Sequence, residues 1–266
     1  QPKSDLASMG VYVFSKKTLR RWLSDDRVDF GRHIIPEMLD AGARVFGYRY
    51  NGYWQDVGTV QSFWEANMAL LEDDPELDLY DPEWVIHTRS EERAPAKIGP
   101  TAQVHRSLIS QGCIINGTVV NSVLSPGVRV DVGAVVRDSI VMFDSVIRSG
   151  AVVDRAILDK EVVVGPGAIV GDGPFPDKPN KREPERLNSG ITVVGKRAII
   201  PRGARIGRNV KVAADIRTTD FVKKVVPSGE SVELMLGVKR LHDHGQGSHE
   251  HVVAAGGARN GRGKGE

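Results

Sequence analysis

The sequence predicts a mixed α/β region followed by a parallel β-helix, and three observations support this prediction. Strand-like and helix-like segments alternate up to about residue 90. From about residue 97, an apolar residue recurs at every sixth position, which is typical of a triangular coil with six residues on each side. The end of the chain is rich in glycine and histidine. We therefore expect an α/β part at 1–92, a β-helix at 93–240 and a disordered tail at 241–266.

The overall composition excludes several classes of protein. With 266 residues, 40% of them hydrophobic and 26% charged, the chain is globular and can bury a substantial core. Its 36 basic and 34 acidic residues give a net charge of only +2, which does not indicate a nucleic-acid partner. Cys113 is the only cysteine, so an internal disulfide is excluded and a cytoplasmic location is expected.

The N-terminal sequence and the hydropathy pattern bear on targeting. No apolar run reaches the roughly 18 residues that a membrane helix needs, so no membrane partner is expected. The chain starts at Gln1 without an initiator Met or the apolar core of a signal peptide. We expect from this that it begins inside a longer protein.

The first 50 residues contain two strand-like segments and one helical segment. Residues 7–14 (A-S-M-G-V-Y-V-F) and 44–50 (R-V-F-G-Y-R-Y) favour strands, and 17–23 (K-T-L-R-R-W-L) has helical spacing. So few strands cannot close a sheet of their own. This region is therefore predicted to be the end of a larger α/β domain.

A capped helix is predicted over about 60–72. Thr59 or Ser62 can cap its start, and Pro75 lies beyond its end. The apolar stripe of this helix consists of Val60, Phe63, Trp64, Asn67, Met68 and Leu71. Asp56, just before the helix, has two interpretations from position alone, a cap for the helix or a metal ligand.

The six-residue repeat predicts the β-helix. Eight successive positions six residues apart are apolar: Val128, Ala134, Ile140, Val146, Val152, Leu158, Val164 and Val170. Leu108, Ile114 and Val120 keep the step in a shifted phase, which predicts a loop or bulge between the two sets. The pattern returns at Val194, Ile200, Ile206 and Val212. With three hexads in each coil, about four coils lie between 98 and 170 and another follows 190.

Two segments fall outside the repeat. Residues 172–189 contain four prolines and mixed charge, so we expect a solvated loop extruded from the coil, with a docking or effector loop as the alternative. The tail contains His242, His244, His249 and His251. Because a flexible tail does not preorganise ligands, we expect only adventitious metal binding there.

Five motifs in series resemble a known family. They are A-S-M-G-V-Y-V-F, D-F-G-R-H-I-I-P, Y-W-Q-D-V-G-T with F-W-E-A-N, L-D-L-Y-D-P-E-W-V-I-H-T, and the hexapeptide coils. In order and spacing they resemble the C-terminal half to two-thirds of bacterial glucose-1-phosphate adenylyltransferase, over about residues 4–240. The resemblance implies a Rossmann-like nucleotidyltransferase domain, completed by a left-handed parallel β-helix, in a homotetramer regulated by a sugar-phosphate allosteric effector.

The resemblance also implies a reaction and its binding residues. The family makes ADP-glucose and diphosphate from ATP and glucose 1-phosphate, for glycogen synthesis. Ser8 matches the serine that binds glucose 1-phosphate, Asp56 matches the aspartate that helps bind the catalytic Mg²⁺, and Trp54 and Tyr53 match aromatics of the sugar site. No covalent nucleophile is required, so no separate catalytic residue is expected. Because the nucleotide-binding motifs of the family are absent, we expect this fragment to be inactive alone.

Several alternatives remain open from the sequence. The protein could be a non-catalytic regulatory subunit of the same family, or a related sugar-nucleotide synthase with another base or sugar. His105 lies in an early coil, and hexapeptide acyltransferases use a coil histidine as a base, although no further signature accompanies it. His33 is expected to pack or cap, Cys113 to be a packed strand residue, and the coil arginines to form a solvated face.

Overall fold

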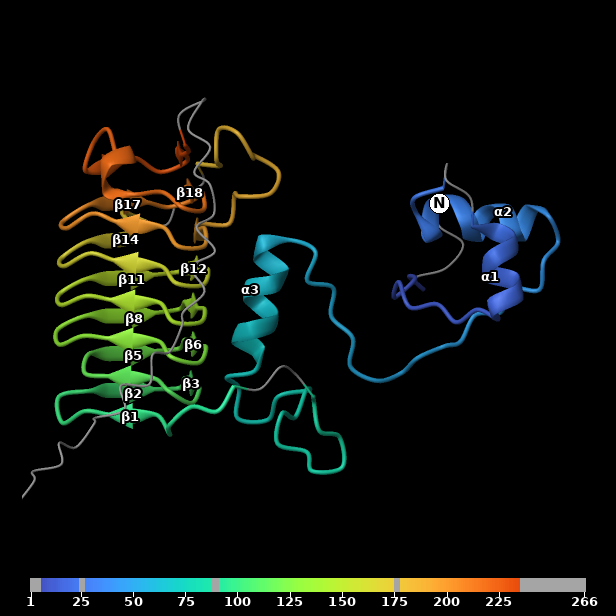
Figure 1. The fold of residues 1–266 in the computed structure, drawn as a ribbon, viewed down its shortest axis with the longest axis horizontal. Coiled ribbons are helices and arrows are strands. Elements are labelled where there is room, and N and C mark those ends of the chain that lie inside the picture. The colour runs from blue at the N-terminus through green and yellow to red at the C-terminus, as the bar shows by residue number, and fades with distance from the viewer. Residues whose placement is uncertain (1–5, 24–26, 88–90, 175–177, 235–266) are drawn as a thin grey trace, which may run out of the picture. The chain divides into compact units, whose positions relative to one another are not determined.

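The computed structural model describes residues 6–23, 27–87, 91–174 and 178–234. Within these ranges the chain forms twenty short strands, all paired in parallel, in three sheets that form the sides of a β-helix (Figure 1). From β1 to β18 successive strands go to successive sheets, so each coil contributes one strand to each side, and the last two strands, β19 and β20, belong to sheets B and C. The predicted tail at 241–266 lies outside the described residues.

The three sheets are called A, B and C. Sheet A contains β1 (Lys97–Ile98), β4 (Ile114–Ile115), β7 (Arg129–Val130), β10 (Val146–Ile147), β13 (Val163–Val164) and β16 (Ile199–Ile200). Sheet B contains β2 (Gln103–His105), β5 (Thr118–Val120), β8 (Val135–Arg137), β11 (Val152–Asp154), β14 (Ile169–Asp172), β17 (Arg205–Gly207) and β19 (Val225–Val226). Sheet C contains β3 (Leu108–Ile109), β6 (Val123–Leu124), β9 (Ile140–Val141), β12 (Ala156–Leu158), β15 (Thr192–Val194), β18 (Lys211–Val212) and β20 (Ser231–Val232).

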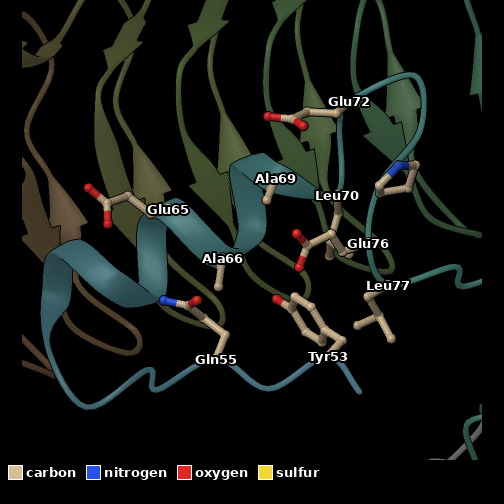
Figure 2. A pocket seen from close by; sticks show the side chains of 10 residues that line it. Tyr53, Gln55, Glu65, Ala66, Ala69, Leu70, Glu72, Glu76 and Leu77 are labelled. Atoms are coloured by element: carbon tan, nitrogen blue, oxygen red, sulfur yellow. The ribbon is translucent and has the colours of Figure 1, made fainter. Parts of the chain in front are cut away.

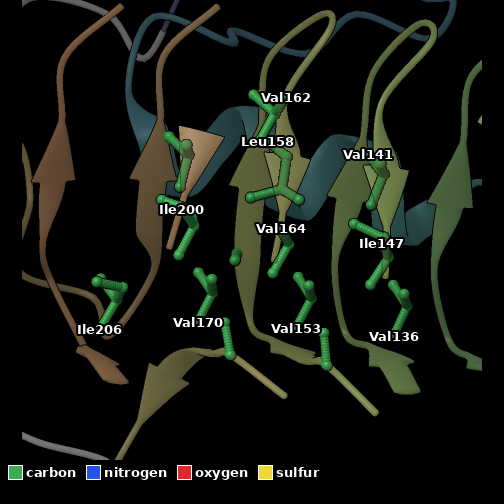
Figure 3. Packing of buried hydrophobic residues seen from close by; sticks show 14 of the residues in the cluster. Val136, Val141, Ile147, Val153, Leu158, Val162, Val164, Val170, Ile200 and Ile206 are labelled. Carbon is green, nitrogen blue, oxygen red and sulfur yellow. The ribbon is translucent and has the colours of Figure 1, made fainter. Parts of the chain in front are cut away.

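The interior of the β-helix is filled by one apolar side chain from nearly every strand. Figure 3 shows these side chains stacked along the coil, among them Val136, Val141, Ile147, Val153, Leu158, Val164 and Val170. Each is fully buried, and its strand neighbour points outward. Parallel stacking on three sides buries a continuous core that a single coil could not form, which is why the repeat folds as an array.

The six-residue register predicted for 128–170 is wrong in detail. Val146 pairs with Val163, and Val152 with Ile169, so each of these coils is one residue shorter than three hexads. One side of each coil is therefore shortened, so a constant step of six moves from the inner to the outer face and returns to the inner face at Leu158. Ile140 consequently lies on the outer face of sheet C.

The register predicted for the later coils is confirmed. Val194, Ile200, Ile206 and Val212 all point inward. Val193 pairs with Lys211, which is a separation of three complete hexads. A constant step of six therefore stays on the inner face in this part of the β-helix.

The corner between sheets B and C repeats one conformation on four coils. It consists of residues in the left-handed region, with φ between 44° and 49°, which we call the corner ladder: Arg106, Asn121, Asp138 and Arg155. A serine follows three of the four. Ser139 is an example: its Oγ donates to the Arg137 carbonyl and accepts from the amide of Ala156 in the next coil, at 2.6 and 3.1 Å. These hydroxyls supply hydrogen-bond partners for the backbone groups that the turn takes out of the pairing between strands.

Helix α3 (Val60–Ala69) covers the outer face of sheet C (Figure 1). It begins, as predicted, with Thr59, whose side chain and that of Ser62 cap each other's backbone amides. Residues of α3 and outward residues of sheet C form one apolar cluster. The domain boundary between residues 92 and 93 stays a prediction. The predicted apolar stripe packs on outward residues of the β-helix, including Leu108, Val123, Ile140, Ile157 and Val193.

The segment at 172–189 leaves the coil between β14 and β15, as predicted, and most of residues 181–189 are exposed, but two buried residues anchor it to the coil. Asn180 is fully buried, and Leu187 is 2% exposed. The Asn180 amide donates to the carbonyls of Asn209 and Glu230 at 2.9 and 2.8 Å. The sequence did not predict this anchoring amide, because a single buried asparagine has no periodic signal.

The region before α3 contains three short helical elements. They are α1 (Lys16–Trp22), capped by Ser15, a π-helical turn η1 (Phe30–Ile34) and α2 (Ile35–Asp40). A 3₁₀ turn, η2 (Thr218–Asp220), lies near the other end. The strands predicted at 7–14 and 44–50 do not form in the described residues, because a strand needs a paired neighbour and neither segment has one. None of the described helices is long and apolar enough to cross a bilayer.

Candidate sugar-phosphate site

Asp56 lies in an exposed turn immediately before α3. Its Oδ1 accepts a hydrogen bond from the amide of Gly58 at 2.9 Å, which is a local turn of the kind that aspartate favours. Thr59 caps the helix. The interpretation of Asp56 as the helix cap is therefore wrong, and its carboxylate is left for another role.

The donor set around Asp56 fits half of a magnesium site. Its Oδ2 accepts no hydrogen bond from any described residue, and no group of three or more potential metal ligands occurs in the part of the chain that the structure describes. Magnesium is commonly bound by only one or two carboxylates together with water and substrate phosphates. A Cβ on Gly58 would lie 3.1 Å from Asp56 Oδ1, so glycine keeps the space next to the carboxylate open.

Tyr53 and its neighbour Gln55 line a cavity of about 300 Å³ beside α3. Figure 2 shows Tyr53 next to Glu76 and Leu77, with Ala66 and Ala69 of α3 on the opposite wall. Trp54, between the two lining residues, is 44% exposed and does not line this cavity. The stretch before the helix therefore alternates, with Tyr53 and Gln55 against α3 and Trp54 toward solvent.

Ser8 lies in the extended segment near the start of the chain. Its Oγ accepts from the amide of Gly10 at 3.2 Å and lies 3.1 Å from the Tyr12 hydroxyl. Tyr12 belongs to a small aromatic cluster with Phe14 and Phe30, whose ring centroids lie 5.5 to 6.3 Å apart. Among the described residues no hydrogen bond joins Ser8 to the Asp56 turn. The structure places Tyr53 beside α3.

A charged cluster on sheet B was not predicted from the sequence. Asp154 accepts from Arg208 at 2.7 Å and from Arg137 at 3.0 Å. Arg208 is only 7% exposed, which corrects its assignment to a solvated face. Burial raises the pKa of Asp154, but the hydrogen bonds from the two arginines outweigh it and hold this pKa below the usual 3.8. Arg137 and Asp154 are paired on neighbouring strands, a relation that can be read from the sequence only when the coil length is known.

His105, Cys113 and His33 were also singled out from the sequence, and each has a separate environment in the described part of the chain. His105 is exposed on β2, the first strand of sheet B in chain order. Cys113 is fully buried just before β4, as predicted, and burial raises the pKa of its thiol, so it remains protonated and unreactive. His33 lies in η1 with a buried Nδ1 that has no hydrogen-bond partner in the described part of the chain.

Comparison with known proteins finds relatives of both parts of the chain. A family model for nucleotidyl transferases matches residues 1–73, and one for the GlmU-like C-terminal hexapeptide matches residues 94–194. A glucose-1-phosphate adenylyltransferase of Thermomicrobium roseum is 58% identical over 239 residues, which cover 87% of this chain and 55% of the relative. This chain is a relative of the glucose-1-phosphate adenylyltransferases. The resemblance predicted from the five motifs is thereby confirmed.

Further adenylyltransferases match over a similar part of the chain. The enzyme of Acetivibrio thermocellus is 45% identical over 87% of this chain and 55% of its own length. That of Fervidobacterium nodosum is 41% identical over 80% of this chain and 52% of its own length. The chain thus spans about half the length of the curated relatives it matches.

Proposed function

We propose that this chain supplies the sugar-phosphate side of a glucose-1-phosphate adenylyltransferase. The observation that carries the proposal is the 58% identity to an adenylyltransferase over 87% of the chain. The exposed Asp56 carboxylate, with one oxygen that accepts no hydrogen bond from a described residue, supports it. The remaining half of such an enzyme would provide the nucleotide-binding side, so the proposed activity belongs to the full-length protein.

The four candidate residues have distinct roles in this proposal. The Ser8 hydroxyl hydrogen-bonds glucose 1-phosphate, Tyr53 contacts the sugar from the cavity beside α3, and Trp54 contacts it from the opposite, solvent-facing side of the stretch. Asp56 holds one side of a Mg²⁺ ion, which when bound neutralises phosphate charge. The turn with Gly58 fixes the direction of the Asp56 carboxylate before the ligand arrives, which lowers the cost of ordering it.

The reaction requires positioning more than covalent chemistry. A phosphate oxygen of glucose 1-phosphate attacks the α-phosphorus of ATP, the bond to the β-phosphate oxygen breaks, and diphosphate leaves with ADP-glucose as the product. The residues of this chain hold the attacking phosphate in line and exclude alternative orientations of the sugar. A role in glycogen synthesis, a homotetramer and a sugar-phosphate effector are part of the same proposal.

The test is an Asp56→Asn substitution in the full-length protein. Asparagine can still accept the Gly58 amide, so folding should be preserved, while loss of the charge should lower diphosphate release by about a hundredfold or more, as for other transition-state electrostatic contacts. The measurement is the rate of diphosphate release from ATP and glucose 1-phosphate against magnesium concentration. Turnover within about twofold of the parent would remove the metal assignment.

A matched control is Asp81→Asn. Asp81 is also an aspartate in a turn, with its Oδ1 2.8 Å from the amide of Glu83. Asp81 shares the local geometry of Asp56 but not the proposed role. The Asp81→Asn variant should therefore release diphosphate at the same rate as the parent. The same assay with other nucleoside triphosphates and sugar phosphates separates the adenylyltransferase from a related synthase, and no turnover with any pair would favour a regulatory subunit.

A further inference from the structure

Three residues of the corner ladder hold α3 against the β-helix by polar contacts. The indole Nε1 of Trp64 donates to the Asp138 carbonyl at 2.8 Å. The guanidinium of Arg155 lies 4.4 Å from the centroid of the same indole ring. Arg106 Nε donates to the Leu71 carbonyl, just beyond the end of the helix, at 3.3 Å. The helix is thus held at its middle and at its C-terminal end.

The partners of Trp64 are themselves fixed. Asn121 donates to the Asp138 carboxylate at 2.6 Å, from the coil before. Arg155 donates through Nε to the Ser189 carbonyl at 3.2 Å, where the extruded segment returns to the coil. Burial lowers the pKa of Arg155, yet the guanidinium stays charged at neutral pH and is attracted to the face of the indole ring. The contact is therefore a charged stacking interaction that is partly shielded from water.

The opposite side of α3 carries the candidate site. Tyr53 and Gln55 lie against Ala66, Ala69 and Leu70 in the cavity of Figure 2. The hydrogen-bonded Asp56–Gly58 turn and the Thr59 cap connect these residues to the helix. Asp56 thus lies three residues before the cap of α3, joined to it by a short connection with a hydrogen-bonded turn.

We propose that Arg155 and Trp64 are positioning residues, through which the β-helix fixes the location of Asp56 in the sugar-phosphate site. This inference rests on the proposed function, because it assigns the Asp56 turn to that site. On this proposal the β-helix is part of the substrate-binding apparatus, because a shift of α3 on sheet C would move Asp56, the proposed metal ligand. A displacement of about 1 Å at a catalytic group lowers rates by about a hundredfold.

Amide hydrogen exchange tests the docking without reference to activity. In the full-length protein, Arg155→Ala should raise exchange in residues 53–69 by about tenfold and leave β7 to β12 unchanged, because the inner core is not altered. Trp64→Phe, which keeps a ring and loses the Nε1 donor, should act in the same direction. Arg148→Ala is the control, since Arg148 pairs with Asp131 at 3.6 Å on the coil and is not a residue of the corner ladder. Unchanged exchange in 53–69 for Arg155→Ala would overturn the proposal.

Kinetics test the consequence for the site. Arg155→Ala should raise KM for glucose 1-phosphate and the magnesium concentration for half-maximal rate by about fivefold to twentyfold, with KM for ATP unchanged. Arg155→Lys should recover part of the effect, because an ammonium group can also lie over the indole. Faster exchange with unchanged kinetics would overturn the positioning role while Asp56→Asn still reports on the proposed function. If Arg148→Ala raised KM and the magnesium requirement by as much as Arg155→Ala, the proposal would also be overturned, because both effects would then reflect a general loss of stability.

Discussion

At the scale of single residues, Asp154 shows how the β-helix tolerates buried charge. Its carboxylate lies between Arg137 and Arg208, and the side chains of Asp154 and Arg208 are 12% and 9% exposed. Arg208 also donates to the Gly173 carbonyl at 3.1 Å, where the extruded segment leaves the coil. Removing the aspartate charge would leave the arginine buried without its main counter-charge, which is costly in a site of low exposure.

This arrangement predicts a defined pH dependence of stability. The pKa of folded Asp154 lies below 3.8, so its contribution is complete above about pH 5, where unfolded aspartate is almost fully ionised, and is lost as pH falls through the folded pKa. Asp154→Asn should therefore reduce the free energy of unfolding by about 3 kcal/mol at pH 7. Urea unfolding at pH 7 and at pH 3 measures the effect. If the free energies of unfolding of variant and parent differed by the same amount at pH 7 and at pH 3, the assignment would be contradicted.

At the residue scale, the sequence could not predict contacts that depend on the local geometry of side chains. The motif around Asp56 predicted a metal ligand, whereas position alone favoured a helix cap. The structure excludes the cap, because Thr59 caps α3, and the metal ligand stays a prediction. The contact between Trp64 and Arg155 joins residues that are far apart in the sequence, and no period or motif connects them. Such pairs are set by packing and are invisible to an analysis of neighbouring residues.

At the scale of elements, β12 shows why the two faces of a short strand must be distinguished. Ile157 points outward and packs in the cluster with α3, whereas Leu158 points into the coil. Adjacent residues of one strand therefore belong to two separate cores. The sequence shows both as apolar, but the faces could not be assigned without the coil length.

Substitution of these two neighbours should have separable effects. Ile157→Ala removes a contact of α3 and should raise amide exchange in the helix, with little change in the unfolding of the coil. Leu158→Ala leaves a cavity in the inner core and should lower the free energy of unfolding by about 2 to 5 kcal/mol. Urea unfolding together with exchange in residues 60–69 distinguishes the two. Similar global destabilisation by both substitutions would argue against two cores.

The anchored segment between β14 and β15 gives a second prediction for an element. Besides the bonds that it donates to the carbonyls of Asn209 and Glu230 and to the Ser231 hydroxyl, the Asn180 side chain accepts from the amides of Arg182 and Glu183 at 3.0 and 3.1 Å. Asn180→Ala should therefore destabilise this segment by about 2 to 3 kcal/mol, because buried groups on both sides lose partners. Limited proteolysis within 178–189 is the measurement. The control is Asn188→Ala, an exposed amide, and equal protease sensitivity of the two variants would contradict the anchoring role.

At the scale of the whole molecule, the distribution of buried residues is uneven. Before residue 60, the buried apolar side chains among the described residues are Ile34 and Met38. From α3 onward the inner core continues along the coils, and the outer core lies between α3 and sheet C. The stability of the described chain therefore resides in the β-helix together with the helix that covers it.

Limited proteolysis of the chain should reveal this distribution. The protease-resistant product is expected to begin between residues 51 and 59 and to retain α3, because cleavage before this point removes little buried surface. Mass spectrometry of the product locates its start. A product that begins close to residue 93 would contradict the packing of α3 on sheet C as a stable interaction.

The architecture itself was predictable, and the reason is periodicity. The recurrence of apolar residues predicted the coils, and their interruption predicted the extruded segment between β14 and β15. The exact register was not predictable over 128–170, because a coil one residue shorter than three hexads imitates a six-residue step for several positions before it departs from it. The strands expected at 7–14 and 44–50 could not be judged from propensity, since their formation depends on neighbours.

The spacing of paired strands has a consequence for protein engineering. In sheet B, Gln103 pairs with Thr118 across a short coil, whereas Ile169 pairs with Arg205 across the whole extruded segment. Pairing nevertheless continues on all three sheets across the long interval. Length is thus constrained within strands and variable at corners, so foreign peptides could be grafted at a corner while the stacking of the coils above and below is retained.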